Sequence, residues 1–148
     1  MAERSKSVDR FLEPQKSGYP TALAEIRNGR KSSHWMWYIF PQLRGLGRSH
    51  MARYYGIEDL AEARVYLNHP VLGQRLREIT RVLLELPESD PGKIFGWPDD
   101  LKLCSCMTLF AQVSEDDLFE QVLWKYFDGR ADTVTIHLLR KTRRKNDD

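Results

Sequence analysis

The stretch RKSSHWMWYIFPQ, from Arg30 to Gln42, places groups that bind anions directly before groups that stack on planar rings. Arg30 and Lys31 are cations, and Ser33 supplies a hydroxyl. Gly29, just before them, lets a ligand approach the backbone closely. A helix that begins after such a turn also offers free N–H groups and the positive end of its dipole. The pattern therefore predicts a site for a phosphate or another small anion.

A second turn of similar composition, Gly47-Arg48-Ser49-His50, follows a short way along the chain. Arg48 and Ser49 are its candidate ligand-binding residues. Two such turns suit a diphosphate, or two phosphates on one ligand. The alternative is that the serine of each turn only caps a helix, because serine is among the residues favoured at that position.

Two tryptophans, a methionine, a tyrosine, an isoleucine and a phenylalanine follow the first turn. At helical spacing these side chains cannot all share one face, so the segment is either covered nearly all round or open to a ligand on one side. In the second case Trp35 or Trp37 stacks on a planar ring whose phosphate is held by Lys31. Gln42 then hydrogen-bonds the edge of the ring. In the first case the segment is hydrophobic core.

A third polar cluster, Trp97-Pro98-Asp99-Asp100-Leu101-Lys102, begins another expected helix. Acids in a first helical turn are favoured by the dipole alone, and Asp99 can pair with Lys102 three residues later. If the fold brings His34 beside Asp99, the imidazole becomes an oriented general base, which predicts a hydrolase. The spacing along the chain does not decide whether these two residues meet.

The charges of the chain are unevenly distributed, although its net charge is only +2. Residues 1–54 hold ten Lys/Arg and four Asp/Glu, whereas residues 55–148 hold thirteen Lys/Arg and seventeen Asp/Glu. The basic first third is therefore where an anionic partner is expected. A surface of this kind suits a protein or nucleic-acid interaction module as well as a small ligand.

Helix signals recur along the chain and strand signals are few, which predicts an all-α single domain of about seven to nine short helices. We expect Pro14 to disturb a first helix over Val8–Lys16, and Pro20 to begin a second that ends at Asn28. Serines should cap the helices that begin near residues 33, 49 and 114. A weak last helix is expected over 132–140. The domain should span residues 10–140, between a polar N-terminal extension over 1–9 and a frayed basic and acidic tail over 141–148.

The remaining composition argues against several classes of protein. Cys104 and Cys106 are two apart, so inside a helix they diverge and do not form a disulfide. The histidines are scattered, which predicts no metal site. The longest apolar run covers Trp35–Phe40, far short of the roughly 20 residues that span a bilayer. We therefore expect a cytoplasmic protein with no membrane partner and no cofactor.

Several segments resemble a bacterial family catalogued as domain of unknown function 1810: GRKSSHWMWYIFPQLRGLGRS, YLNHPVLGQRLRE, IFGWPDDLKLCSCMTLF and VLWKYFDGR. The resemblance implies a mainly helical single domain over about residues 10–138 and no established activity, and the calpastatin label of some members adds no mechanism. It places the family's polar signature on Lys31, Ser33, His34, Trp35, Trp37, Gln42, Gly45, Gly47, Arg48, Ser49, Asp99, Lys102 and Ser105. Where the family has Arg-Ser-Ser, this chain has Cys104-Ser105-Cys106, which keeps only the central serine.

The leading prediction is binding of a small, planar, phosphate-bearing ligand, a nucleotide or nucleotide-sugar, between the Arg30–Gln42 segment and the Asp99–Lys102 helix start. The expected ligand-binding residues are Arg30, Lys31, Ser33, Trp35, Trp37, Gln42, Arg48, Ser49, Lys102 and Ser105. The alternatives are a hydrolase that uses His34 with Asp99, and an interaction module that uses the basic first third.

Overall fold

The computed structural model describes residues 7–147, with side chains described from Ser7 to Lys141. Within this range the chain forms one all-helical domain, as predicted, and the only extended pairing is an isolated parallel bridge between Leu43 and Ile57. A 3-10 helix, η2 (Val8–Phe11), comes first. The α-helices of the described residues are α1 (Leu12–Arg27), α2 (Met36–Ile39), α3 (His50–Tyr54), α4 (Leu60–Asn68), α5 (Leu72–Glu85), α6 (Pro91–Phe95), α7 (Asp99–Ala111), α8 (Leu118–Phe127) and α9 (Thr133–Asp147).

Helix α1 is continuous, so the prediction of two helices separated near Pro20 is wrong. Pro14 lies in the first turn, where a backbone N–H has no partner within the helix and its absence costs little. Pro20 is interior, but the hydroxyl of Thr21 donates to the carbonyl of Ser17 at 3.2 Å one turn earlier. The buried face of α1, which includes Tyr19 and Ile26, keeps the helix against the core on both sides of the proline.

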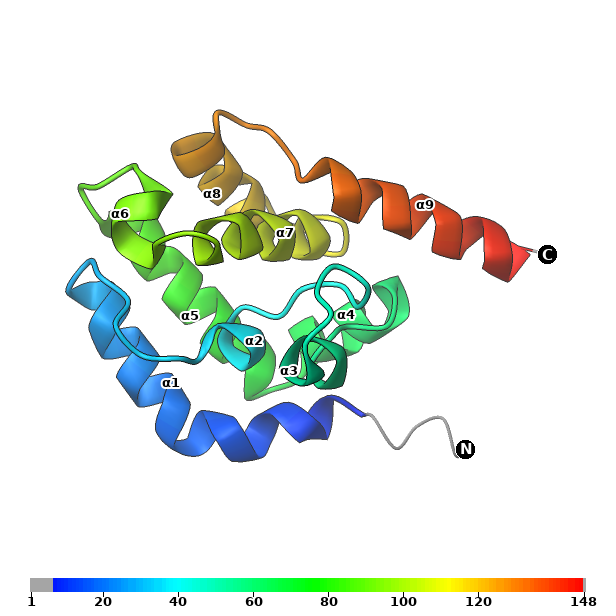
Figure 1. Cartoon of the computed structure of the whole chain (residues 1–148), viewed down its shortest axis with the longest axis horizontal. Helices are drawn as coiled ribbons and strands as arrows, with labels where there is room; N and C mark the ends of the chain where they lie inside the picture. The colour runs from blue at the N-terminus through cyan, green and yellow to red at the C-terminus, as the bar shows by residue number, and fades with distance from the viewer. Residues whose placement is uncertain (1–6, 148) are drawn as a thin grey trace.

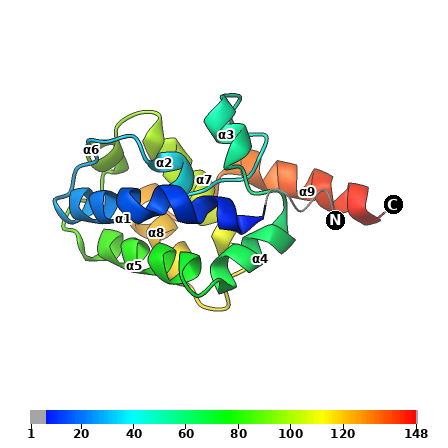
Figure 2. The same ribbon diagram turned by 90° about the horizontal axis from the view of Figure 1, so that it is seen from below.

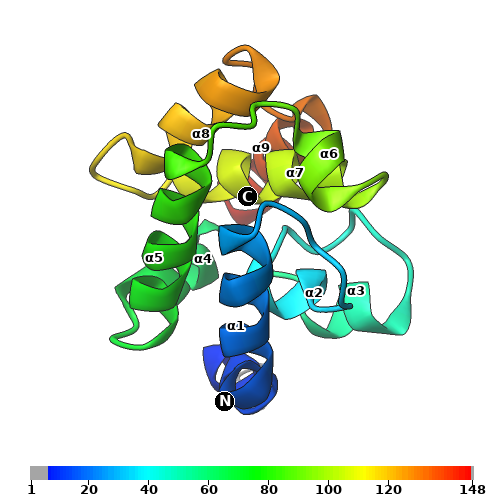
Figure 3. The same ribbon diagram turned by 90° about the vertical axis from the view of Figure 1, so that its left-hand side faces the viewer.

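The helices pack around one core, with α1 against α5, α5 against α8, and α8 against α7 (Figures 1 and 3). Helix α4 contacts both α5 and α7, and α6 contacts α7. Helix α9 contacts α7 at its start and then leaves the body of the molecule (Figures 1 and 2). The largest fully buried side chains are Phe11, Trp35, Phe40, Tyr66, Phe110 and Phe119.

The predicted helix ends are confirmed in part. Ser49 caps α3 by accepting a hydrogen bond from Ala52 N at 3.1 Å. Ser33 and Ser114 cap no helix, because each hydroxyl donates to a carboxylate instead, Ser33 to Glu25 and Ser114 to Asp116. The helix expected from residue 33 is accordingly short, α2, and begins only at residue 36. Helix α9 continues to residue 147, past the expected end at 140. Most of the predicted N-terminal extension, residues 1–6, lies outside the described residues.

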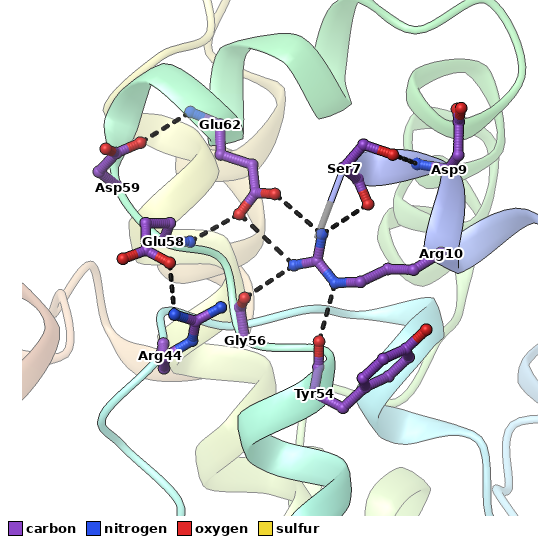
Figure 4. A network of polar contacts seen from close by, with 9 residues as sticks. All are labelled: Ser7, Asp9, Arg10, Arg44, Tyr54, Gly56, Glu58, Asp59 and Glu62. Atoms are coloured by element: carbon purple, nitrogen blue, oxygen red, sulfur yellow. Dashed lines mark hydrogen bonds and ion pairs between the residues drawn. The ribbon is translucent and has the colours of Figure 1, made fainter. Parts of the chain in front are cut away.

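One buried arginine fastens the start of the chain to α3 and α4 (Figure 4). The side chain of Arg10 is only 3% exposed and pairs with Glu62 at 2.8 Å. Its guanidinium also donates to the carbonyls of Ser7, Tyr54 and Gly56 at 2.7–2.8 Å. Tyr54 is the last residue of α3, and Gly56 lies two residues after it. Arg10 therefore fixes the position of α3 relative to the core.

Candidate functional site

The first basic turn holds an anion, but the anion belongs to the chain itself. Glu25, in the last turns of α1, accepts hydrogen bonds from the backbone N–H groups of Ser32 and Ser33 at 2.8 and 3.0 Å. It also accepts the hydroxyl of Ser33 at 2.5 Å and the indole N–H of Trp35 at 2.9 Å. The groups that were predicted to bind a phosphate are thus occupied by a carboxylate, which closes the 28–35 loop onto α1.

These contacts change the acidity of Glu25. Burial alone would raise its pKa, but the hydrogen bonds from Ser33, Ser32 and Trp35 outweigh that effect and lower the pKa from 4.5 to about 2. Glu25 is therefore ionised at neutral pH and cannot accept a proton from a substrate there. Its role is to position the loop.

Lys31 joins the same loop to the start of α7. Its ammonium lies 2.8 Å from Asp99 Oδ2 and donates to the carbonyl of Ser33 at 2.6 Å. Lys102 lies 3.3 Å from the other oxygen of Asp99, so a single carboxylate bridges two cations. The Lys31 side chain is 8% exposed and the Asp99 side chain 19% exposed, so this ion pair is largely removed from water. The backbone N–H of Lys31 donates to the carbonyl of Ile94 in α6 at 2.7 Å, which adds a second anchor.

The two tryptophans of the loop have different environments. Trp35 is 1% exposed and packs against Phe40 and Phe95, with ring centroids 6.1 and 6.5 Å away. It belongs to the core and offers no face to a ligand. Trp37 is half-buried, and the Lys102 ammonium lies 5.3 Å from its ring centroid. The stretch that contains both residues is therefore core at one tryptophan and part of the surface at the other.

A third indole lies at the same place in the fold. Trp97, on the turn that leads into α7, is 81% exposed. It lies two residues before Asp99, and Leu101 in the first turn of α7 is 55% exposed. Trp97 and Leu101 therefore leave apolar side-chain surface open to solvent at the start of α7. The sequence pointed to this cluster through its acids, whereas the exposure of Trp97 is a result of the fold.

His34 and Asp99 do not form a pair. Both oxygens of Asp99 are engaged by Lys31 and Lys102, and no hydrogen bond or ion pair joins His34 to Asp99 in the part of the chain that the structure describes. His34 is exposed, as is Arg30 beside it in the loop. The His34–Asp99 pair that the hydrolase prediction requires is therefore not formed.

Four other predicted ligand-binding residues lie outside this constellation. Arg48 and Ser49 are exposed at the start of α3, and Ser49 is used as a helix cap. Gln42 is half-buried beside the Leu43–Ile57 bridge. Its backbone carbonyl accepts a hydrogen bond from Ile57 N at 2.9 Å. Ser105 is 6% exposed and donates towards Asp132 at 3.2 Å, which ties α7 to the start of α9.

The thiols of Cys104 and Cys106, on either side of Ser105, show no sign of activation. Both cysteines are free, Cys104 half-buried and Cys106 buried. Burial, together with the nearby Asp132, raises the pKa of Cys104 to about 11, and burial raises that of Cys106 as well. Both thiols are therefore protonated at neutral pH, and a protonated thiol is a weak nucleophile.

The structure thus brings six of the residues predicted for the site into one connected set: Lys31, Ser33, Trp35, Trp37, Asp99 and Lys102. Sequence reasoning missed Glu25, since nothing in its local pattern indicates that a carboxylate on α1 faces the loop that follows.

Comparison with known proteins identifies the family and the fold. A family model described as "Protein of unknown function (DUF1810)" matches residues 5–139. The chain belongs to this family. The chain is also similar to the conserved hypothetical protein Rv1873 from Mycobacterium tuberculosis, a crystal structure, with a TM-score of 0.88 and 47% sequence identity. The likeness covers 90% of this chain and 96% of that one. No curated protein matches the chain.

The family and its relative identify the helical fold of this DUF1810 domain and assign it no activity. Two further structural observations concern metal sites and membrane-spanning helices. No group of His, Cys, Asp and Glu among the described residues is arranged to hold a metal ion. No helix of the described chain is long and apolar enough to cross a membrane.

The Lys31–Asp99 contact in this DUF1810 domain predicts a measurable coupling. In a double-mutant cycle of Lys31→Met and Asp99→Asn, we expect a coupling free energy of about 1–3 kcal/mol from urea unfolding. The matched cycle of Lys102→Met and Asp99→Asn should give less than about 1 kcal/mol, because Lys102 is 28% exposed and its charge is better screened by water. Equal coupling in the two cycles would contradict the view that Lys31 is the structural cation of the site.

Proposed function

We propose that this DUF1810 domain binds a small, planar, phosphate-bearing ligand, a nucleotide or a nucleotide-sugar. The binding surface is the one shared by the 30–37 loop and the start of α7. The observation that carries the proposal is the largely buried ion pair of Lys31 with Asp99 at 2.8 Å, which holds the two segments together. We call the five side chains at least partly open to solvent there the ligand surface: Arg30, His34, Trp37, Trp97 and Lys102.

Each member of the ligand surface has a chemical role in the proposal. Trp97, which is 81% exposed, and Trp37 provide indole faces for stacking on a base or another ring. Stacking of this kind contributes about 1–3 kcal/mol per base and does not depend on which base it is. Arg30 and Lys102 provide positive charge for phosphate oxygens, and His34 adds a hydrogen-bond donor.

The buried residues of the site act by positioning this surface. Lys31 and Asp99 align the loop with α7, and Glu25 fixes the same loop to α1. Trp35 anchors the loop in the core. The proposal therefore moves the stacking role from Trp35 to Trp97 and Trp37.

The hydrolase alternative has less support. It needs His34 to be oriented by Asp99, but this carboxylate is already shared between two ammonium groups. A water activated at this place would need another base, and Glu25 is unsuitable because its pKa is about 2. Binding without turnover is accordingly the function that the arrangement favours.

A thermal-shift and fluorescence titration against ADP, UDP-glucose and a dinucleotide tests the proposal. A ligand at 100 times its Kd adds about 2.7 kcal/mol of stability, a rise in Tm of about 5–10 °C for a chain of this size. Trp97→Ala should weaken binding by about 10–100-fold through the lost stacking. Its Tm without ligand should hardly change, because the side chain is mostly in water.

Trp124→Ala is the matched control. Trp124 is also a solvent-exposed tryptophan, 71% exposed, but it lies on α8. We expect it to bind like the wild type. No shift with any of the three ligand classes, or an equal loss of binding in the two tryptophan variants, would overturn the proposed function.

A further inference from the structure

A second surface, outside the ligand surface, carries exposed cations from two helices that are distant in sequence. Arg48 lies two residues before α3 and Arg53 in its last turn, whereas Arg140 and Lys141 belong to α9. All four are exposed, and none makes an ion pair within the described part of the chain. We call these four residues the basic face.

The loop before α3 connects the two halves of this face. It packs against α9 so closely that a Cβ on Gly45 would lie 3.6 Å from Leu138 Cδ1. Leu46 and Leu138 are both packed against the core. Gly47 in the same loop lies against Ala52 of α3.

Two carboxylates close to the end of α3 are already paired with arginines (Figure 4). Glu62 is paired with the buried Arg10, and Glu58 is paired with Arg44 (Figure 4). The Nε and Nη2 atoms of Arg44 are buried and donate to no group in the described residues. These two carboxylates are therefore compensated by Arg10 and Arg44 and make no ion pair with the cations of the basic face. The resulting potential favours a polyanion.

Two aromatic rings lie on α3, in the same segment as Arg48 and Arg53. Tyr54 is 40% exposed, and its ring stacks on that of the exposed His50 with centroids 6.2 Å apart and an interplanar angle of 16°. In sequence Arg48 precedes His50, and Arg53 lies directly before Tyr54. Cations that follow a phosphate backbone, combined with open ring faces, are the usual means of binding single-stranded nucleic acid. In α9 the sequence adds Arg143, Arg144 and Lys145 after the basic face.

We propose that the basic face binds single-stranded nucleic acid. The four cations contact successive phosphates, and Tyr54 with His50 offers a stacking face to a base. An acidic protein segment would use the charges but would gain little from the open rings, so the nucleic acid fits better. The proposal does not depend on the ligand surface, because no residue is shared between the two.

Fluorescence anisotropy of a labelled twenty-nucleotide oligo-dT with the full chain tests this. With four phosphate contacts, log K should fall with log salt at a slope of about −3, so affinity drops about 50-fold between 50 and 200 mM NaCl. Arg48→Gln with Arg53→Gln should reduce the slope to about −1.5, and so should Arg140→Gln with Lys141→Gln. Tyr54→Ala should weaken binding to the oligonucleotide about tenfold or more, because a stacked base is lost.

Arg27→Gln with Arg81→Gln is the matched control, since both residues are exposed arginines outside the basic face, on α1 and α5. This variant should keep the affinity and slope of the wild type. No binding at 50 mM NaCl, or an equal loss in the control, would overturn the proposal. If an acidic peptide such as oligo-glutamate bound as tightly as oligo-dT and Tyr54→Ala had no effect, a protein partner would replace nucleic acid.

Discussion

Replacing Arg10 with alanine is expected to lower the free energy of unfolding by about 3–5 kcal/mol, the usual cost of removing one partner from a buried ion pair. The Arg10 side chain is 3% exposed, and its partner Glu62 is 15% exposed, so water cannot replace the guanidinium easily. The carbonyls of Ser7, Tyr54 and Gly56 lose a charged donor at the same time. Urea unfolding followed by circular dichroism measures the change.

Two further variants show whether the network or the charge is responsible. Arg10→Lys keeps the charge but lacks the planar set of donors that reaches several carbonyls at once, so we expect it to recover only part of the lost stability. Lys16→Ala removes an ion pair with Glu13 whose side chains are 74% and 84% exposed. Its cost should stay below about 1 kcal/mol. If Arg10→Ala cost no more than Lys16→Ala, Arg10 would not be fastening η2 to α3 and α4.

Glu25→Gln is expected to lower the free energy of unfolding by about 2–4 kcal/mol, because hydrogen bonds to a charged acceptor are stronger than neutral ones. The N–H groups of Ser32, Ser33 and Trp35 all donate to Oε1, which glutamine keeps only as a neutral carbonyl oxygen, so these three bonds weaken. The amide nitrogen that replaces Oε2 cannot accept the hydroxyl of Ser33, which now donates there at 2.5 Å. Trp35 fluorescence and urea unfolding report the effect.

The same carboxylate predicts a pH dependence with a definite sign. The pKa of Glu25 is lower in the folded chain, about 2, than its ordinary value of 4.5, so the folded state favours the ionised form. Its contribution to stability is fully present above pH 4.5 and is lost as the pH falls towards 2. The stability difference between the wild type and Glu25→Gln should therefore shrink over that range. A difference that stays constant from pH 6 to pH 2.5 would show that Glu25 does not hold the loop through its charge.

The local patterns of the sequence determined the secondary structure of most of this domain. Apolar residues at helical spacing lie along α5, α7 and α8, because a helix that packs on one face repeats its apolar positions every three to four residues. Ser49 marked the start of α3, and Asp90 caps α6 just before Pro91. Caps and turns depend on neighbours a few residues away, so the sequence is sufficient to place them.

The local patterns were insufficient where the partner of a group lies far along the chain. Pro20 remains inside α1 because tertiary packing on α5 outweighs the lost hydrogen bond. Ser33 is a cap by its pattern but a donor to Glu25 in the structure. In each case a contact made by the folded chain replaces the one that the local sequence favours.

In the candidate site, too, the sequence indicated the residue types and the tertiary structure decided their partners. The residue types of the Arg30–Gln42 stretch indicated an anion held by a basic turn, and that chemistry is present. The tertiary structure decided that the anion is Glu25, that Asp99 pairs with Lys31, and that Trp97 faces solvent. A charge selects its partner by distance and burial, since Coulomb energy and desolvation depend on both. Those quantities exist only once helices distant in sequence have packed together.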